Sequence, residues 1–169
     1  MGQVVDLSTL EPIRAAARAA SRRVVFTNGA FDLLHVGHVR YLQAARALGD
    51  MLIVGLNSDA SVRGYKGPGR PLVPQEERAE LLAALACVDY VVVFDDPTAA
   101  RLVAALAPDV YVKGGDYTAT GDAPDDTGKP LPEAAIVRAA GGQVVIIPYM
   151  PGKSTTNLIE RIRSMERDA

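Results

Sequence analysis

The sequence is poor in the residues that mark several classes of protein. Its single cysteine, Cys87, cannot form an internal disulfide, which is consistent with a reducing compartment. No apolar run approaches the roughly 20 residues of a membrane span, and residues 1–11 lack the basic and apolar regions of a signal peptide. The net charge is −2, without a Lys/Arg cluster of the kind that follows a nucleic-acid backbone. We therefore expect a cytoplasmic protein whose partners include neither nucleic acid nor a membrane.

What is present is a regular alternation of strand-like and helix-like segments. The length of 169 residues and the apolar content of 49% suit one domain, which we expect to span residues 1–169. Continuous apolar runs predict strands at about 24–28, 51–57, 89–94, 109–113 and 143–147. Helical patterns lie between and around them, at about 36–48, 75–86, 97–107, 132–140 and 155–165. The alternation predicts an α/β fold, a Rossmann-like doubly wound sheet of five parallel strands. A further helix at about 9–20 is expected to cap the sheet edge.

The chain contains only two histidines, and both lie in the run His35-Val36-Gly37-His38 directly after the first predicted strand and its turn. Apolar residues recur in steps of three from Val36 to Leu48, which predicts a helix that begins at this run. Unpaired N–H groups at a helix start attract phosphate, and imidazoles can donate hydrogen bonds to phosphate oxygens. The pattern predicts stabilisation of charge on a reacting phosphate, without a protein nucleophile. The alternatives are a helix cap, a surface pair, or two of the ligands of a zinc ion.

The segment from Asn28 to His38 resembles the signature of the HxGH nucleotidyltransferase superfamily. Three further segments narrow the resemblance to the adenylyltransferase domain of ADP-heptose synthases, namely Asn57-Ser58-Asp59, Val112–Tyr117 and Ser154–Asn157. The resemblance covers about residues 22–163. This resemblance implies transfer of AMP from Mg·ATP to a sugar 1-phosphate, above all D-glycero-β-D-manno-heptose 1-phosphate, with release of pyrophosphate. It also implies Mg²⁺ bound through the phosphates rather than by protein side chains, a homodimer, and a separate sugar kinase that supplies the acceptor.

The expected site follows the ends of the predicted strands, where ligands bind in such sheets. His35, His38 and Lys66 are the expected catalytic residues, and Lys66, Arg70 and Arg78 are expected to contact acceptor or phosphate. The expected nucleotide-binding positions are Asn28, Gly29, Ala30, Phe31, Asp32, Gly37, Asn57, Asp59, Lys113, Gly115, Asp116, Ser154, Thr155 and Thr156.

Several of these roles have a plainer alternative. Lys66 and Arg70 could be solvated cations in a Gly/Pro-rich loop, and Arg78 could form a surface ion pair. Asp32, Asp59 and Asp116 suit turns and caps, and Ser154 suits a helix N-cap.

Three other functions stay open on the sequence alone. A cytidylyltransferase acting on glycerol 3-phosphate or another small phosphorylated acceptor would use the same residues, and the polar insertion at residues 118–131 leaves the acceptor undetermined. A non-catalytic nucleotide sensor and an RNA-binding module are the alternatives from other classes. The intact histidines disfavour the sensor, and the acidic balance disfavours the RNA-binding module.

Overall fold

The computed structural model describes residues 1–115, 117, 130–148 and 155–167. Within them the chain forms one six-stranded sheet whose strands are all parallel, in the order β1-β4-β3-β2-β5-β6. The strands are β1 (Gln3–Val4), β2 (Val24–Gly29), β3 (Met51–Asn57), β4 (Tyr90–Phe94), β5 (Val110–Gly114) and β6 (Gln143–Ile147). The predicted α/β class is confirmed, with six strands rather than five.

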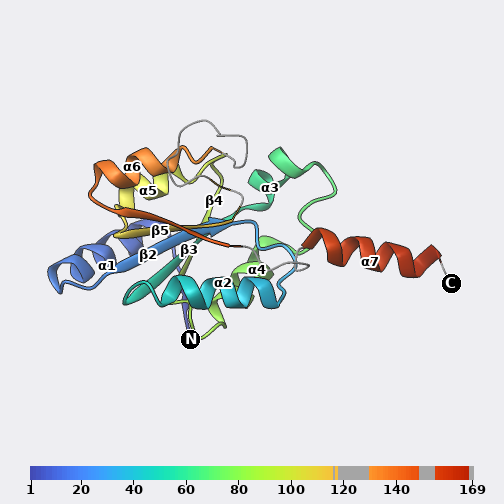
Figure 1. Ribbon diagram of the computed structural model, residues 1–169, viewed down its shortest axis with the longest axis horizontal. Coiled ribbons are helices and arrows are strands. Elements are labelled where there is room, and N and C mark those ends of the chain that lie inside the picture. The colour runs from blue at the N-terminus through green and yellow to red at the C-terminus, as the bar shows by residue number, and fades with distance from the viewer. Residues whose placement is uncertain (116, 118–129, 149–154, 168–169) are drawn as a thin grey trace.

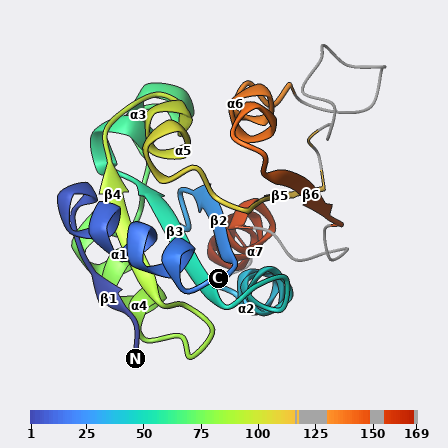
Figure 2. The same ribbon diagram turned by 90° about the vertical axis from the view of Figure 1, so that its left-hand side faces the viewer.

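Helices cover both faces of this sheet (Figures 1 and 2). The helices are α1 (Leu7–Ala19), α2 (Val36–Arg46), α3 (Asp59–Lys66), α4 (Gln75–Ala83), α5 (Ala100–Leu106), α6 (Glu133–Ala139) and α7 (Thr155–Arg167). One buried cluster joins α1, α5 and α6 to one face of the sheet, and the other joins α2 and α4 to the opposite face. Helix α7 extends away from the body of the molecule (Figure 1).

Alternation along the strands explains the two clusters. Phe26 packs in the first cluster, whereas its neighbour Val25 packs in the second, and Ile53 and Leu52 of β3 divide in the same way. Because both faces are covered, strands such as β3 are buried along their whole length, which is why they read as continuous apolar runs.

The predicted strands and helices all form, with ends that differ by at most three residues, but two elements were missed. Strand β1 is only two residues long, too short to produce a pattern, and it pairs with β4 at the sheet edge. Helix α3 runs into a stretch that was predicted as a loop from its glycines, because Ser58 caps it by accepting a hydrogen bond from Ser61 N. The structure therefore places Lys66 at the end of a helix.

The expected position of the first helix was wrong. Helix α1 packs over a face of the sheet against α5, and the edge is occupied by β1. The side chain of Arg14 fixes this packing, since it donates to the carbonyls of Leu106 and Ala107 at the end of α5 and pairs with Asp109.

The order of the strands reverses at β2. The chain passes from β2 to β3 and β4 on one side, and later returns to β5 and β6 on the other. Where the strand order of a parallel sheet reverses, the connections from two neighbouring strands run to opposite sides of the sheet. A crevice forms between them at the carboxyl ends of these strands. The crevice therefore lies between the ends of β2 and β5. The predicted site residues Asp116 and Ser154 and most of the 118–131 insertion lie outside the described residues.

Candidate active site

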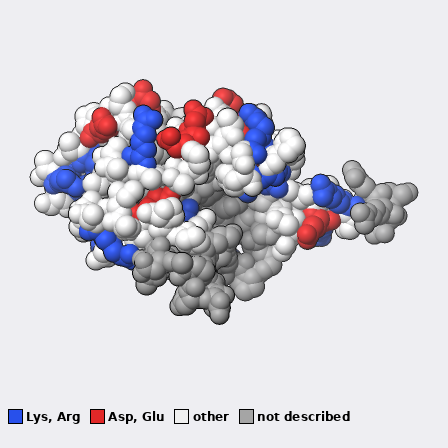
Figure 3. Space-filling model, turned by 90° about the horizontal axis from the view of Figure 1, so that it is seen from above, with Lys and Arg blue, Asp and Glu red and all other residues white. Residues whose placement is uncertain are grey.

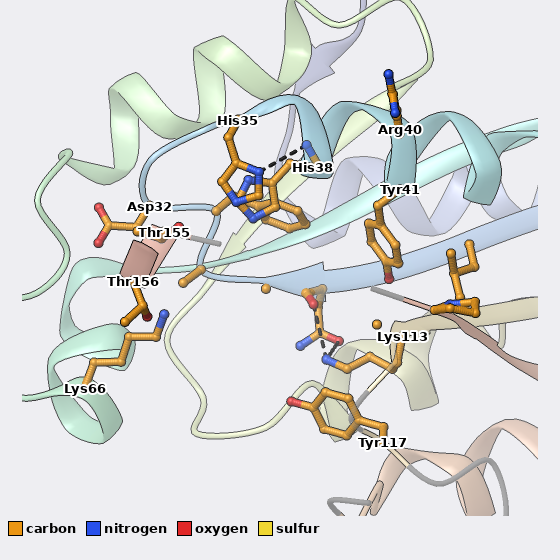
Figure 4. Close-up of a pocket in the computed structure, with 18 of the residues that line it drawn as sticks. Asp32, His35, His38, Arg40, Tyr41, Lys66, Lys113, Tyr117, Thr155 and Thr156 are labelled. Carbon is orange, nitrogen blue, oxygen red and sulfur yellow. Dashed lines mark hydrogen bonds between the residues drawn. The ribbon is translucent and has the colours of Figure 1, made fainter. Parts of the chain in front are cut away.

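A pocket of about 560 Å³ occupies this crevice. Its walls come from the end of β2, the start of α2, the end of α3, the end of β5 and the start of α7. Figure 4 shows the two histidines on one side, with Lys66 and Thr156 toward one end and Lys113 and Tyr117 toward the other. Several predicted positions line it together, namely Asn28, Gly29, Ala30, Phe31, Asp32, His35, Gly37, His38, Lys66, Lys113, Thr155 and Thr156.

His35 is the N-cap of α2. Its backbone is extended, and its ring Nδ1 accepts a hydrogen bond from the backbone N–H of Gly37 at 3.1 Å. Because Nδ1 acts as an acceptor, the proton of the neutral ring is on Nε2. His35 can therefore be both a helix cap and a hydrogen-bond donor to a ligand, since Nδ1 caps the helix while Nε2 of the same ring carries the proton.

The ring of His38 stacks on that of His35, with 3.9 Å between the ring centroids, and the ring of Phe31 meets it edge-on at 5.3 Å. Burial lowers the pKa of His38 to about 4, with smaller contributions in the same direction from His35 and Lys66. His38 is therefore neutral at pH 7. Its Nδ1 is buried without a partner among the described residues. A buried N–H without an acceptor is costly, so we assign the proton to Nε2.

Positive and hydroxyl groups surround the histidines. Lys66 ends α3, with its Nζ 5.8 Å from the ring centroid of Tyr65, and Arg40 lies on α2 at the pocket wall. At the start of α7, Thr155 donates to the carbonyl of Leu33 at 3.4 Å, which ties this helix start to the loop before α2. Such a set of donors suits a ligand rich in anionic oxygens.

Arg78 has a different place from the one expected. Its side chain is 0% exposed and is not part of the pocket wall. The guanidinium donates to the carbonyls of Ala30, Asn57 and Val73 and pairs with Asp59 at 2.7 Å. Every nitrogen of its fork is thus used inside the protein. The expected contact with the acceptor is corrected to a structural role, which joins the ends of β2 and β3 to the segment before α4.

The phrase Asn57-Ser58-Asp59 also shapes the pocket without lining it. Asn57 is buried and its amide donates to the hydroxyl of Ser61 at 3.0 Å, while Asp59 holds Arg78. Both side chains are used within the protein, and the expected direct contacts of Asn57 and Asp59 with nucleotide stay predictions.

Asp32 holds the segment that follows α3. Its carboxylate accepts from Arg70 at 2.6 Å and from the backbone N–H groups of Leu72 at 2.7 Å and Val73 at 3.1 Å. Arg70 is directed to this carboxylate and is not part of the pocket wall. The Gly/Pro-rich segment after Lys66 is thus anchored at its far end, and Gly115 lies exposed just beyond β5.

Sequence reasoning missed the tyrosines of the pocket. Tyr41 lies one turn after His38, and its hydroxyl shares a hydrogen bond with Thr27 at 2.7 Å and donates to the carbonyl of Val112 at 3.1 Å. Its spacing from His38 was a usable signal, since residues three apart share a helix face. Tyr65 and Tyr117 line the pocket too.

A metal ion held through the phosphates rather than by protein side chains stays a prediction. Within the described part of the chain, no three His, Cys, Asp or Glu side chains gather as a metal-binding group. Asp32, which supplies a carboxylate to the pocket wall, is already engaged by Arg70 and two backbone amides. The donor set therefore suits phosphates, which would themselves carry the metal.

Two features of the molecule at large accompany this site. None of the helices in the described ranges is long and apolar enough to cross a membrane. On the face shown in Figure 3, Lys and Arg side chains are interspersed with Asp and Glu.

Comparison with known proteins places the chain in a family. The family model described as cytidylyltransferase-like matches residues 26–161. "Bifunctional protein HldE" of Trichlorobacter lovleyi is 54% identical over 160 residues, which are 95% of this chain and 31% of that protein. The protein of the same name from Streptomyces coelicolor is 52% identical over 149 residues, 88% of this chain and 30% of its own length. The chain thus spans about a third of the length of the curated relatives it matches.

A solved structure adds evidence for the fold. The lipopolysaccharide core biosynthesis protein from Thermoplasma volcanium superposes with a TM-score of 0.58 at 26% identity, over 76% of this chain and 97% of that one. The region that the family model matches contains the stacked histidines and most of the sheet and pocket described above. The chain belongs to the cytidylyltransferase-like family and is a nucleotidyltransferase.

Proposed function

We propose that this domain transfers AMP from Mg·ATP to D-glycero-β-D-manno-heptose 1-phosphate and releases pyrophosphate. The observation that carries the proposal is the stacked His35–His38 pair at the start of α2, which shares one pocket with Lys66 and Thr155. The choice of acceptor is supported by the phrases that resemble ADP-heptose synthases and by relatives named HldE at about half identity. The solved relative is named a lipopolysaccharide core biosynthesis protein, which is in keeping with this choice.

The reaction needs a nucleophile, a leaving group and stabilisation of charge. An oxygen of the acceptor phosphate attacks the α-phosphorus of ATP, and the bond from that phosphorus to the bridging oxygen breaks, so that pyrophosphate leaves. The Nε2–H groups of His35 and His38 donate to phosphate oxygens on which negative charge increases, and the N-terminus of α2 adds the positive end of its helix dipole. Lys66 neutralises the incoming phosphate from the end of α3.

A divalent metal accompanies the nucleotide in this chemistry, and we propose Mg²⁺. It would join phosphate oxygens and offset their charge, held chiefly by the substrate. The hydroxyls of Thr155 and Thr156 and the ammonium of Lys66 would then face the phosphates from the other side of the pocket.

The acceptor must already be phosphorylated, so a sugar kinase has to supply it. We propose that this activity resides outside residues 1–169. We also propose a homodimer, the state common among the enzymes that the sequence resembles, which light scattering of the purified protein tests.

Pyrophosphate release by the purified protein tests the function. ATP and CTP are each combined with heptose 1-phosphate, other sugar 1-phosphates and glycerol 3-phosphate in the presence of Mg²⁺. We expect release with ATP and heptose 1-phosphate. Release only with CTP and glycerol 3-phosphate would overturn the proposal in favour of the sister reaction, and nucleotide binding without release across the panel would favour a sensor. A His38→Ala variant in the same panel controls for contaminating enzymes.

A further inference from the structure

The end of β2 is joined to the end of β5 through one asparagine side chain. The Oδ1 atom of Asn28 accepts a hydrogen bond from the hydroxyl of Tyr111 at 2.6 Å and from Nζ of Lys113 at 3.2 Å. The same Nζ also donates to the backbone carbonyl of Asn28 at 3.2 Å. Figure 4 shows the side chain of Lys113, with dashed lines marking its hydrogen bonds.

The strand register explains why these three side chains meet. Tyr111 and Lys113 are two residues apart on β5 and so project from the same face. Tyr111 is paired with Phe26 across the β2–β5 ladder, and the next residue of β2 on that face is Asn28. The rings of Phe26 and Tyr111 stack with 5.8 Å between their centroids, which fixes the direction of the tyrosine hydroxyl.

These contacts determine which way the amide of Asn28 is turned. An ammonium group can only donate, so the atom of Asn28 that faces Lys113 has to be its oxygen. Burial raises the pKa of Tyr111, which keeps its hydroxyl protonated and able to donate to the same oxygen. The amide is planar, with Nδ2 on the other side of Cγ from Oδ1. Its two N–H donors therefore point away from Tyr111 and Lys113, and Asn28 lines the pocket.

We propose that the amide nitrogen of Asn28 donates a hydrogen bond to an acceptor oxygen of the bound nucleoside triphosphate, and that Tyr111 and Lys113 are positioning residues that set this orientation. Asn28 lies at the β2–β5 crevice and lines the same pocket as the histidine pair and Gly114. This inference rests on the proposed function only in so far as the pocket binds a nucleotide.

Lys113 acts in this scheme through Asn28 rather than on the ligand. The residue is 8% exposed, and its ammonium lies 4.6 Å from the ring centroid of Tyr117 in addition to its two bonds with Asn28. The sequence-based expectation that Lys113 itself binds nucleotide is therefore the competing hypothesis. The two hypotheses for Lys113 can be separated. If Lys113 acts through Asn28, the losses of nucleotide affinity on replacing the two residues are coupled, whereas direct binding by Lys113 predicts independent losses.

The first test changes only the group that faces the nucleotide. Asn28→Asp keeps the size of the side chain and still accepts from Tyr111 and Lys113, but it presents an acceptor where the amide presented a donor. Dissociation constants for Mg·ATP and Mg·CTP are measured by calorimetry. We expect at least a tenfold weaker affinity for the nucleotide that the wild type binds, with an unchanged or raised melting temperature. Binding within threefold of wild type would overturn the proposal.

A double-mutant cycle tests the positioning role. Asn28→Ala, Lys113→Met and the double variant are compared for nucleotide affinity. If Lys113 acts through Asn28, the double variant binds within about twofold of Asn28→Ala. If the two losses multiply, Lys113 contacts the nucleotide directly and the positioning assignment is wrong.

A milder variant covers the case in which Lys113→Met does not fold. Tyr111→Phe removes one hydroxyl, and we expect it to weaken nucleotide binding about threefold in the wild-type background and not at all in Asn28→Ala. Tyr90→Phe, which removes a hydroxyl on β4 outside the pocket, is the matched control. Equal losses from Tyr111→Phe in both backgrounds would overturn the positioning role.

The same experiments separate this inference from the proposed function. A wild type that binds nucleotide but forms no nucleotide sugar with any tested acceptor would sink the proposed function and leave the Asn28 measurements valid. A wild type that binds neither nucleotide would sink both. Normal turnover with heptose 1-phosphate together with an unaffected Asn28→Asp variant would sink only the inference.

Discussion

At the scale of the residue, His38 is the side chain whose removal should cost most activity. In the proposed mechanism the Nε2–H of His38, which lines the pocket, donates to the reacting phosphate, and replacement by alanine removes that donor. We expect kcat to fall on the order of 10²–10³-fold. Pyrophosphate release measures the effect, and nucleotide affinity and melting temperature serve as controls. A loss below about threefold would remove His38 from the mechanism.

The lowered pKa of His38 also predicts how stability depends on pH. The ring titrates at about 4 in the folded protein but near its ordinary value of 6.5 in the unfolded chain. Between these values the unfolded chain binds more protons, so the free energy of unfolding rises with pH across this window and is lost as pH falls from about 6.5 toward 4. Melting temperatures between pH 7 and 4.5 should therefore fall more steeply for the wild type than for His38→Gln. Parallel curves would contradict the assignment.

Arg78 shows where residue-level reasoning failed. An arginine near a predicted phosphate site has the right chemistry for an anion, and the sequence contains nothing that says its fork is filled by three carbonyls and Asp59. The residues that supply those carbonyls come from three separate segments, and only the tertiary fold brings them together. The histidine pair, by contrast, lies within four residues and could be predicted from local sequence.

The same arginine yields a stability prediction. Arg78→Lys keeps the charge, but one ammonium cannot reach acceptors that lie around a planar fork. We expect the free energy of unfolding to fall by about 3 kcal/mol or more, since a buried pair is left incomplete. Urea denaturation measures this, and Glu77→Gln on the exposed side of the same helix is the control. If Arg78→Lys left the free energy of unfolding unchanged and raised the KM for the acceptor, the expected phosphate-binding role of Arg78 would be restored.

At the scale of the element, the segment between α3 and α4 depends on Asp32. Its carboxylate is bonded to Arg70 and to two backbone amides of that segment. Asp32→Asn loses the ion pair while it keeps one acceptor oxygen, and we expect a loss of about 1–3 kcal/mol in the free energy of unfolding. The KM for the acceptor should rise as well, because Lys66 begins this segment. Urea denaturation and kinetics check both, and Glu77→Gln is again the control.

The elements themselves were largely predictable. Long apolar strands such as β3 and the helix after His35 have a clear period, and the alternation of the two types implies parallel pairing. Strand β1 has two residues and no period, and α3 contains Gly64, so neither was visible. The pocket tyrosines were missed for a related reason, since Tyr65 lies in α3, which was not predicted, and Tyr117 follows β5, whose end was placed one residue too early.

At the scale of the whole molecule, the proposed nucleophile determines which sugars can serve as acceptors. Because the proposed nucleophile is a phosphate oxygen, heptose without its 1-phosphate should give no pyrophosphate with Mg·ATP, and adding a sugar kinase with its ATP should restore release. Coupled pyrophosphate detection measures both cases, with the 1-phosphate as positive control. Release with the free sugar would mean that a hydroxyl is the nucleophile.

The pairing of β2 with β5 has a consequence for synthesis of the chain. The histidines follow β2 near the start of the chain. The strand that pairs with β2 at the pocket, β5, comes much later in the chain, as the pairing of Phe26 with Tyr111 shows. When only the part of the chain before β5 has been made, the histidine pair is present but the β5 residues that line the pocket are not. The binding site can therefore be complete only after β5 has been made, late in synthesis of the domain.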